Sequence, residues 1–386
     1  MKIFYLARIN IATEDASTRH VFEFCREFAR MGHEMVLFVP DLGERRELEG
    51  VRFVYVPVGI KKKSATYLLF YLSLFFLLPF YLVSNRPQVV YTRHQQLEWL
   101  ATCWKWMFKF SYVIESNGLA PVELKMNSAP DWWIKIVKWM EWFCFRMPDL
   151  IVTSALQLRD VMCGNYNLNP NKFLVVSNGA NPDIFKPMDL KVCREKLQLD
   201  LDGVYLIFIG SLRKWHGLDQ IILAMVQLRE RFPDMYLLLV GDGEERGKVE
   251  KLISKNQLEG RVLMVGEKPF REIPIYINSA DICLGSFIEK PGISPLKIYE
   301  YMACGKPLIC NSAGGLDALF DKHKVGTLVL SQDPHEWTKA IGDMLNHPER
   351  MAEYGRNGLI AVDKEFNWEA ICEKIENALD RLVSSK

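Results

Sequence analysis

The sequence predicts an α/β protein of two domains, each with a parallel sheet covered by helices on both faces. Short apolar strands alternate with helical stretches along the chain, which is the pattern of βαβ units. One turn-rich segment, Ser177–Pro187, interrupts this alternation and marks a boundary. With 386 residues and 49% hydrophobic content, the chain is large enough for two cores. We therefore expect domains at residues 1–180 and 181–366, and a last helix at 367–386 that could pack back on the first domain.

Charge and cysteine usage narrow the class of protein. The net charge of +1 argues against a nucleic-acid partner. The nine cysteines are odd in number and include no C-x-x-C pair, which favours reduced thiols in a cytoplasmic protein over disulfides or a zinc site. The first residues, MKIFYLARIN, read as a strand and lack the features of a signal peptide.

The first domain should begin with a βαβ unit, a strand at Lys2–Ile9 and a helix at Arg19–Met31 joined by a polar turn. The turn lacks G-x-G-x-x-G, so the sequence does not predict a dinucleotide site there. Further strands are expected at Met35–Val39, Arg52–Val56, Gln88–Thr92, Tyr112–Glu115, Leu150–Thr153 and Phe173–Val176.

Polar side chains follow two of these strands at their carboxyl ends. The carboxyl ends of parallel strands meet at one edge, where open α/β sheets bind ligands. Each residue alone would also suit an ordinary loop, and the first helical turn could be merely solvated. Together they suggest acid/base groups at Arg93, His94 and Glu115, and acceptor-side contacts at Ser17, Arg19 and Asn117.

An apolar stretch at Thr66–Val83 and the segments after it favour a membrane surface. The stretch lies between two strands of one sheet, so a single membrane span is not expected. A buried helix and a helix in the membrane interface remain as alternatives. Seven of the ten tryptophans lie between Trp99 and Trp142. The segment from Val51 to Arg146 contains 12 basic and 5 acidic residues, a net charge of +7 (12 − 5). Aromatic and basic residues together suit anionic headgroups, so we expect docking to an anionic membrane.

The second domain restarts the alternation. Strands are expected at Val204–Ile209, Met235–Val240, Val262–Val265, Asp281–Leu284 and Pro307–Cys310, with a helix at Leu218–Arg231. Asp200 and Asp202 form a D-x-D pair, but its place beside the boundary argues against a metal site.

The stretch Gly285–Gly315 is where we expect the chemistry. Ser294 suits an N-cap and Pro295 a first helical position, before a helix at Leu296–Cys304. Such a helix start is an anion site, and Lys297 and Glu300 share one face just inside it. A surface salt bridge between the two is the alternative that spacing leaves open. Arg213 and Lys214 follow a neighbouring strand and could approach the same anion.

Several segments together resemble the retaining glycosyltransferases of family 4. They are SNGANPDIFKP, GSLRKWHGLD, LLLVGDGEE, ADICLG and above all SPLKIYEYMACGKPLIC. The resemblance covers nearly the whole chain. It implies the GT-B architecture of two facing Rossmann-like doubly wound domains with the active site in the cleft between them, a nucleotide diphosphate sugar as donor, retention of configuration, and no cofactor or metal.

The resemblance also implies roles for single residues. Glu300 matches the family glutamate that binds the ribose hydroxyls, whereas the family's first glutamate is Gly292 here. The basic pair of the family's glycine-rich loop falls on Ser211 and His216, and both of these are departures. The expected donor-binding residues are Arg213, Lys214, Gly266, Pro269, Gly292, Ser294, Leu296, Lys297 and Glu300.

These arguments predict a hexosyltransferase of glycan or polysaccharide biosynthesis, cytoplasmic and peripheral at the inner face of the membrane. Its acceptor would be lipid-linked or held at the membrane surface. Two other interpretations remain: another GT-B enzyme such as a nucleotide-sugar epimerase, and a non-catalytic nucleotide-sugar-binding subunit. An epimerase would need acid/base groups at the sugar, where Gly292 supplies none.

Overall fold

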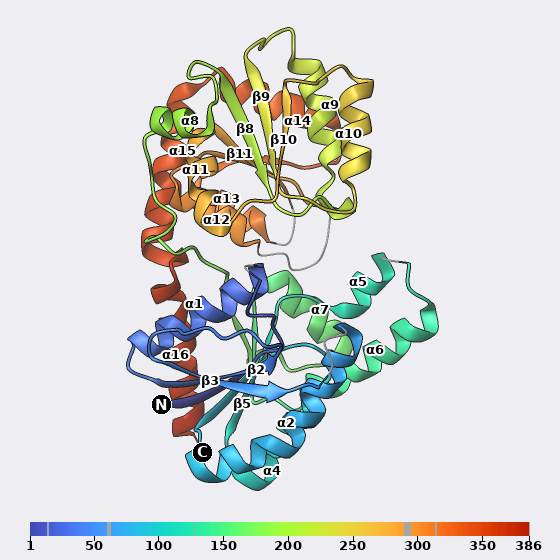
Figure 1. Cartoon of the computed structure of the whole chain (residues 1–386), viewed down its shortest axis with the longest axis vertical. Helices are drawn as coiled ribbons and strands as arrows, with labels where there is room; N and C mark the ends of the chain where they lie inside the picture. Colours follow the sequence, from blue (N-terminus) through green and yellow to red (C-terminus); the bar gives the residue numbers. More distant parts are fainter. Residues whose placement is uncertain (14, 60–62, 127, 289–294, 313–314, 386) are drawn as a thin grey trace. The chain divides into compact units, whose positions relative to one another are not determined.

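The computed structural model describes residues 1–13, 15–59, 63–126, 128–288, 295–312 and 315–385. The chain forms two compact units (Figure 1). The first unit contains Met1–Ser177 and Trp368–Lys386, and the second contains Asn178–Asn367. The chain therefore leaves the first unit once and returns to it for the last helix.

The first unit is built on a seven-stranded parallel sheet of order β3-β2-β1-β4-β5-β6-β7. The chain progresses outward from β1 in one direction and from β4 in the other. A reversal of this kind marks the sheet edge where α/β proteins bind ligands. The strands are β1 (Lys2–Leu6), β2 (Glu34–Asp41), β3 (Val51–Pro57), β4 (Val89–Arg93), β5 (Ser111–Ser116), β6 (Leu150–Thr153) and β7 (Phe173–Val175).

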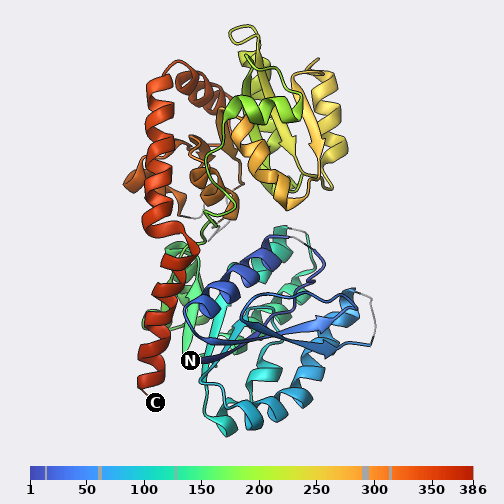
Figure 2. The same cartoon turned by 60° about the vertical axis from the view of Figure 1, so that its left-hand side comes forward.

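Two helices distant in sequence cover one face of this sheet, α1 (Ala16–Arg30) and α16 (Trp368–Ser384). Asp15 starts α1 by accepting hydrogen bonds from two amides of its first turn. In Figure 2, α16 is the red helix that ends at the C-terminus, along one side of the rest of the first unit. His33 Nε2 lies 2.6 Å from Glu376 Oε1 and fixes α16 to the segment that follows α1.

Helix α2 (Lys63–Asn85) lies against the opposite face and has two apolar sides. One side joins the core through Phe70, Tyr71, Leu74, Leu78 and Leu82. The other side is exposed at Leu68, Leu72, Phe76, Phe80 and Val83. Its window Leu68–Asn85 has a mean hydropathy of 1.8 and is 28% buried, so α2 is long and apolar enough to cross a membrane. A core side on the sheet explains much of its apolar content, whereas the exposed side has no such explanation within the unit.

The remaining helices of the first unit follow β4, β5 and β6. They are α3 (Trp99–Thr102), α4 (Lys105–Phe108), α5 (Ala120–Met126), α6 (Asp131–Cys144) and α7 (Leu156–Tyr166). Helix α6 is largely exposed on its outer side, at Trp132, Trp133, Ile136, Trp139 and Trp142.

The second unit has a six-stranded parallel sheet of order β10-β9-β8-β11-β12-β13. Its strands are β8 (Val204–Ile209), β9 (Met235–Val240), β10 (Val262–Gly266), β11 (Ile282–Gly285), β12 (Leu308–Asn311) and β13 (Gly326–Val329). Its helices are α8 (Leu190–Leu197), α9 (Leu218–Leu228), α10 (Arg246–Lys255), α11 (Ile273–Ser279), α12 (Leu296–Ala303), α13 (Leu316–His323), α14 (Pro334–Leu345) and α15 (Pro348–Ala361).

Helix α12 follows β11 and begins at Leu296, as the sequence predicts. Pro295 occupies the capping position, whereas the sequence predicted Ser294 as the cap and Pro295 as suited to the first helical position. Gly305 at φ +68° ends the helix, because this backbone conformation suits glycine. Ser294, the predicted cap, and Gly292 lie outside the described residues.

Candidate active site

The first turn of α12 holds a buried ammonium group in the second unit. Lys297 Nζ is buried and has no hydrogen-bond partner within the described ranges. It lies 4.1 Å from the ring centroid of Phe208 and 5.3 Å from that of Phe287. Burial lowers the pKa of Lys297 to about 7, although the charge of Glu300 opposes this shift. A nearby anion would raise this pKa and so favour the protonated, charged form of the amine.

Gly210, directly after β8, makes room for Lys297. A Cβ at Gly210 would lie 2.7 Å from Lys297 Nζ. The backbone φ of +146° also disfavours any side chain here. The glycine therefore lets a backbone loop approach the ammonium group, as anion-binding loops do.

His216 belongs to the same site, although the sequence marks it only as a departure from the family pattern. Its Nδ1 donates a hydrogen bond to the carbonyl oxygen of Ser286 at 2.8 Å. Burial, together with the charges of Lys297 and Arg213, lowers the pKa of His216 to about 3. The ring is thus neutral, with the proton on Nδ1 and a lone pair on Nε2. It supplies no cation at this position of the family's basic pair.

The other residues predicted to bind the donor differ in how near they lie to the first turn of α12. Glu300 is buried on α12, and its charge acts on Lys297. Arg213 is exposed with its guanidinium 4.8 Å from the Trp215 ring centroid, and its charge reaches His216. Lys214 is exposed at the start of a short 3-10 turn. Gly266 accepts a hydrogen bond from the Gly241 amide at 2.8 Å, and Pro269 follows in the same loop. The charges of Lys297 and Arg213 both act on His216, and the charge of Glu300 acts on Lys297. Among the described residues, neither Lys214 nor Pro269 makes a side-chain hydrogen bond or ion pair with this group.

The start of α12 adds backbone donors. The first amides of a helix have no intrahelical acceptors and carry the positive end of the helix dipole. Pro295 has no amide hydrogen, so Leu296 and Lys297 carry the first amide hydrogens of this turn. The turn therefore combines backbone donors with one buried ammonium, which suits a phosphate group.

In the first unit, Glu115 is the centre of a second cluster. His20 Nε2 lies 2.7 Å from Glu115 Oε1, and Tyr91 donates its hydroxyl to Oε2 at 3.0 Å. Asn117 Nδ2 donates to Oε1 at 2.5 Å. Burial alone would raise the pKa of Glu115, but the charges of His20 and Arg93 and the Asn117 hydrogen bond outweigh it and lower the pKa to about 2. Glu115 is therefore a fixed carboxylate at neutral pH.

This cluster gathers most of the residues predicted on the acceptor side. Arg93 donates to the carbonyl oxygen of Ser17 at 3.3 Å. Strand register explains the gathering, since Arg93 pairs with Glu115 across β4 and β5. Arg19 lies half-buried on the same first turn of α1 as Ser17. A buried carboxylate with this pKa fits a positioning role for Glu115 better than the predicted acid/base role.

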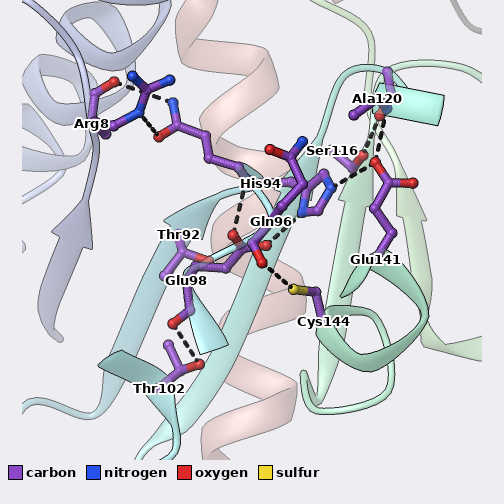
Figure 3. A network of polar contacts seen from close by, with 12 residues as sticks. Arg8, Thr92, His94, Gln96, Glu98, Thr102, Ser116, Ala120, Glu141 and Cys144 are labelled. Carbon is purple, nitrogen blue, oxygen red and sulfur yellow. Dashed lines mark hydrogen bonds and ion pairs between the residues drawn. The ribbon is translucent and has the colours of Figure 1, made fainter. Parts of the chain in front are cut away.

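His94 lies in a separate buried network (Figure 3). Its Nδ1 is 2.5 Å from Glu98 Oε1, and its Nε2 is 3.1 Å from Glu141 Oε1. Burial would lower the pKa of His94, but the charges and hydrogen bonds of the two carboxylates raise it to about 10. Both nitrogens are protonated and occupied, so this arrangement does not fit the acid/base role predicted for His94.

The network around His94 links three helices. Glu141 on α6 also accepts the Ala120 amide at 2.8 Å and the hydroxyl of Tyr166 at the end of α7. The thiol of Cys144 donates to the carbonyl oxygen of Gln96 at 3.3 Å. The ligand atoms of His94, Glu98 and Cys144 lie within 4.8 Å of one another. A metal could bind there only by displacing protons from both the imidazole and the thiol, because burial and Glu98 raise the pKa of Cys144.

The D-x-D pair near the boundary has a structural explanation. Asp200 Oδ1 accepts the amide hydrogen of Asp202 at 3.1 Å, which is the hydrogen bond of a local turn. This carboxylate organises the chain before β8.

Two family models match the chain, one in each half. Residues 191–361 match the model described as "Glycosyl transferases group 1", and residues 17–184 match the model described as "Glycosyltransferase Family 4". The curated D-inositol 3-phosphate glycosyltransferase of Corynebacterium aurimucosum is 29% identical over 240 residues, covering 59% of this chain and 55% of that protein. The protein of the same name from Corynebacterium urealyticum is 30% identical over 219 residues, covering 53% and 51%. The chain spans about half the length of the curated relatives it matches.

Solved structures are similar over the whole chain. Sucrose-phosphate synthase from Thermosynechococcus elongatus has a TM-score of 0.83 at 20% identity, with 100% of both chains covered. HepE from Anabaena in complex with UDP-glucose has a TM-score of 0.77 at 16% identity, with 99% and 100% covered. These likenesses and the two parallel sheets confirm the predicted GT-B fold.

Proposed function

We propose that this chain, which belongs to the group 1 glycosyltransferases, transfers a sugar from a nucleotide diphosphate sugar to an acceptor bound by the first unit. The observation that carries the proposal is the buried ammonium group of Lys297 in the first turn of α12. A lysine without a hydrogen-bond partner in the described ranges is costly unless a ligand completes it. A diphosphate is the group that fits a lysine, a glycine loop and a helix start together.

In the proposed reaction, the leaving diphosphate gains negative charge as its bond to the sugar breaks. Lys297 and the amides of Leu296 and Lys297 meet that charge with donors already in place, and many enzymes gain most of their rate from such stabilisation. Arg213 can add a further cation from its exposed loop. Glu300 would accept hydrogen bonds from the ribose hydroxyls. Because Lys297 supplies the cation, we propose no metal requirement, and the retention of configuration implied by the family pattern belongs to the same proposal.

The proposed acceptor is lipid-linked or held at the membrane surface. The support is the apolar residues that α2 and α6 expose, among them Phe76 and Phe80 at 70% and 73% exposure and Trp139 at 66%. Exposed apolar faces of this size on a soluble unit favour a membrane or a partner. The basic excess of the same segment favours an anionic membrane and supports the proposed location at the cytoplasmic face.

Product analysis tests the proposed reaction. A panel of nucleotide sugars, radiolabelled in the sugar, is incubated with the chain and a total membrane-lipid extract. The proposal predicts that one donor passes label to the organic phase and that Lys297→Met abolishes this transfer. Conversion of a donor to its epimer without an acceptor would favour an epimerase. Nucleotide binding without release of nucleoside diphosphate would favour a non-catalytic binding subunit.

A further inference from the structure

A pocket of about 320 Å³ opens between the outer side of α6 and the end of α7. This volume lies near the lower end of the roughly 300–1,000 Å³ typical of small-molecule sites. None of its residues belongs to the group around Lys297 or to the cluster around Glu115. Its lining consists of Lys135, Lys138, Trp139, Trp142, Asn165 and Tyr166.

The lining combines cations with aromatic rings. Lys135 and Lys138 are one turn apart on α6, so both ammonium groups can reach one anion. The guanidinium of Arg146 lies 4.3 Å from the ring centroid of Trp142 and adds a third positive charge near the rim. Indole rings beside cations are typical of sites that contact both the phosphate of a lipid headgroup and the hydrocarbon chains beneath it.

The floor of the pocket is fixed by the buried network described above. Tyr166 is buried and donates its hydroxyl to Glu141. Glu141 in turn holds His94 and the Ala120 amide. Arg146 also donates to the carbonyl oxygen of Tyr166 at 3.4 Å. The pocket is thus preorganised on its inner side, while its cations are exposed.

We propose that this pocket binds the phosphate headgroup of an anionic phospholipid of the bilayer. The exposed rings of Trp132, Trp133 and Trp139 continue from the pocket along α6 and would lie at the level of the headgroups. A free phosphate would gain nothing from these rings, whereas a lipid uses both the cations and the apolar surface. The proposal rests on the proposed membrane location and adds one discrete headgroup site to it.

Calorimetric titration of the full chain with monomeric dihexanoyl-phosphatidylglycerol, below its micelle concentration, tests the site without a bilayer. We expect saturable binding, and roughly two- to thirtyfold weaker binding for Lys135→Gln/Lys138→Gln, since each exposed ion pair contributes about 1.4- to 5-fold. The matched control is Lys251→Gln/Lys255→Gln, which removes two exposed lysines of α10 in the second unit and should leave the affinity unchanged. Equal affinities of the two double variants would overturn the proposal.

Two further measurements distinguish an anionic lipid from a neutral lipid or free phosphate, and the pocket from the membrane location. Dihexanoyl-phosphatidylcholine or inorganic phosphate binding as tightly as the anionic lipid would also overturn it. Flotation with phosphatidylglycerol vesicles tests the membrane location independently. If the chain floats but does not bind the monomeric lipid, the membrane location is supported and the pocket is excluded as a headgroup site. If the chain binds the monomeric lipid but does not float, the headgroup site is supported and the membrane location is excluded.

Discussion

The ammonium nitrogen of Lys297 lies 4.1 Å from the ring centroid of Phe208, on the strand that precedes the Gly210 loop. The aromatic ring faces the cation where water or a carboxylate would normally be found. A cation–π contact compensates only part of the cost of burying an ammonium group. The buried charge therefore carries an electrostatic cost that an anion would relieve.

Replacing Lys297 by Met should stabilise the protein in the absence of ligand. The folded pKa of about 7 lies below the ordinary value of 10.5, so the cost of burying Lys297 is complete below pH 7 and disappears as the pH rises toward 10.5. We expect a gain of roughly a few kcal/mol at pH 6 that shrinks steadily up to pH 10. Thermal unfolding across this range measures it. Lys255→Met on the exposed side of α10 is the control, and a lower midpoint for Lys297→Met at pH 6 would contradict the account.

Binding of a nucleoside diphosphate should be accompanied by proton uptake. At pH 8 most of Lys297 is neutral in the free protein, and a diphosphate beside it would raise its pKa and recharge it. We expect uptake of roughly half to one proton per ligand. Calorimetry in two buffers of different ionisation enthalpy gives this number. Lys297→Met should show none, and equal uptake in the variant would assign the proton to another group.

The sequence predicted the two sheets and the α12 helix because each is encoded locally. Alternating apolar strands, glycine stops and Pro295 can be read within a few residues. Strand β13 (Gly326–Val329) was missed because its short run is only partly buried and was hidden among helical patterns. The gathering of Arg93 and Glu115 was predictable, since both end neighbouring parallel strands.

The state of His94 could not be predicted from its own neighbourhood. Glu98 is four residues away, but Glu141 arrives from α6 through tertiary packing. Position at a strand end suggested an acid/base group, and two distant carboxylates turned it into a buried cation. The neutral state of His216 could not be predicted for a related reason, because it depends on burial and on the charge of Lys297.

His94→Gln should destabilise the first unit by roughly 3–5 kcal/mol, since it leaves two buried carboxylates without their cation. The folded pKa of about 10 lies above the ordinary value of 6.5, so the stabilisation is complete below pH 6.5 and is lost as the pH rises through 10. Unfolding by urea at pH 6 and pH 10 tests both statements. His347→Gln, at a more exposed ion pair, is the control. A constant difference at both pH values would contradict the ion-pair account.

The exposed side of α2 should contribute to membrane binding. Phe76→Gln/Phe80→Gln should weaken flotation with anionic vesicles by roughly tenfold or more, since each buried phenylalanine contributes about 1.5–3 kcal/mol. The side chains of Phe76 and Phe80 are 70% and 73% exposed, so the thermal midpoint of the double variant should not fall. Leu330→Gln/Ile360→Gln removes two exposed apolar side chains of the second unit and should float like the wild type. Equal flotation of both double variants would exclude α2 from the membrane surface.

The central claim is that the first turn of α12 binds the diphosphate of a nucleotide sugar through Lys297. Calorimetric titration of UDP, GDP and ADP into the wild-type chain and into Lys297→Met tests it most directly. The account predicts that one of these ligands binds with a stoichiometry near one, and that the variant binds it roughly ten- to a hundredfold more weakly, as expected for a lost hydrogen bond to a charged group. Binding of none of the three, or equal affinity in the variant, would contradict it.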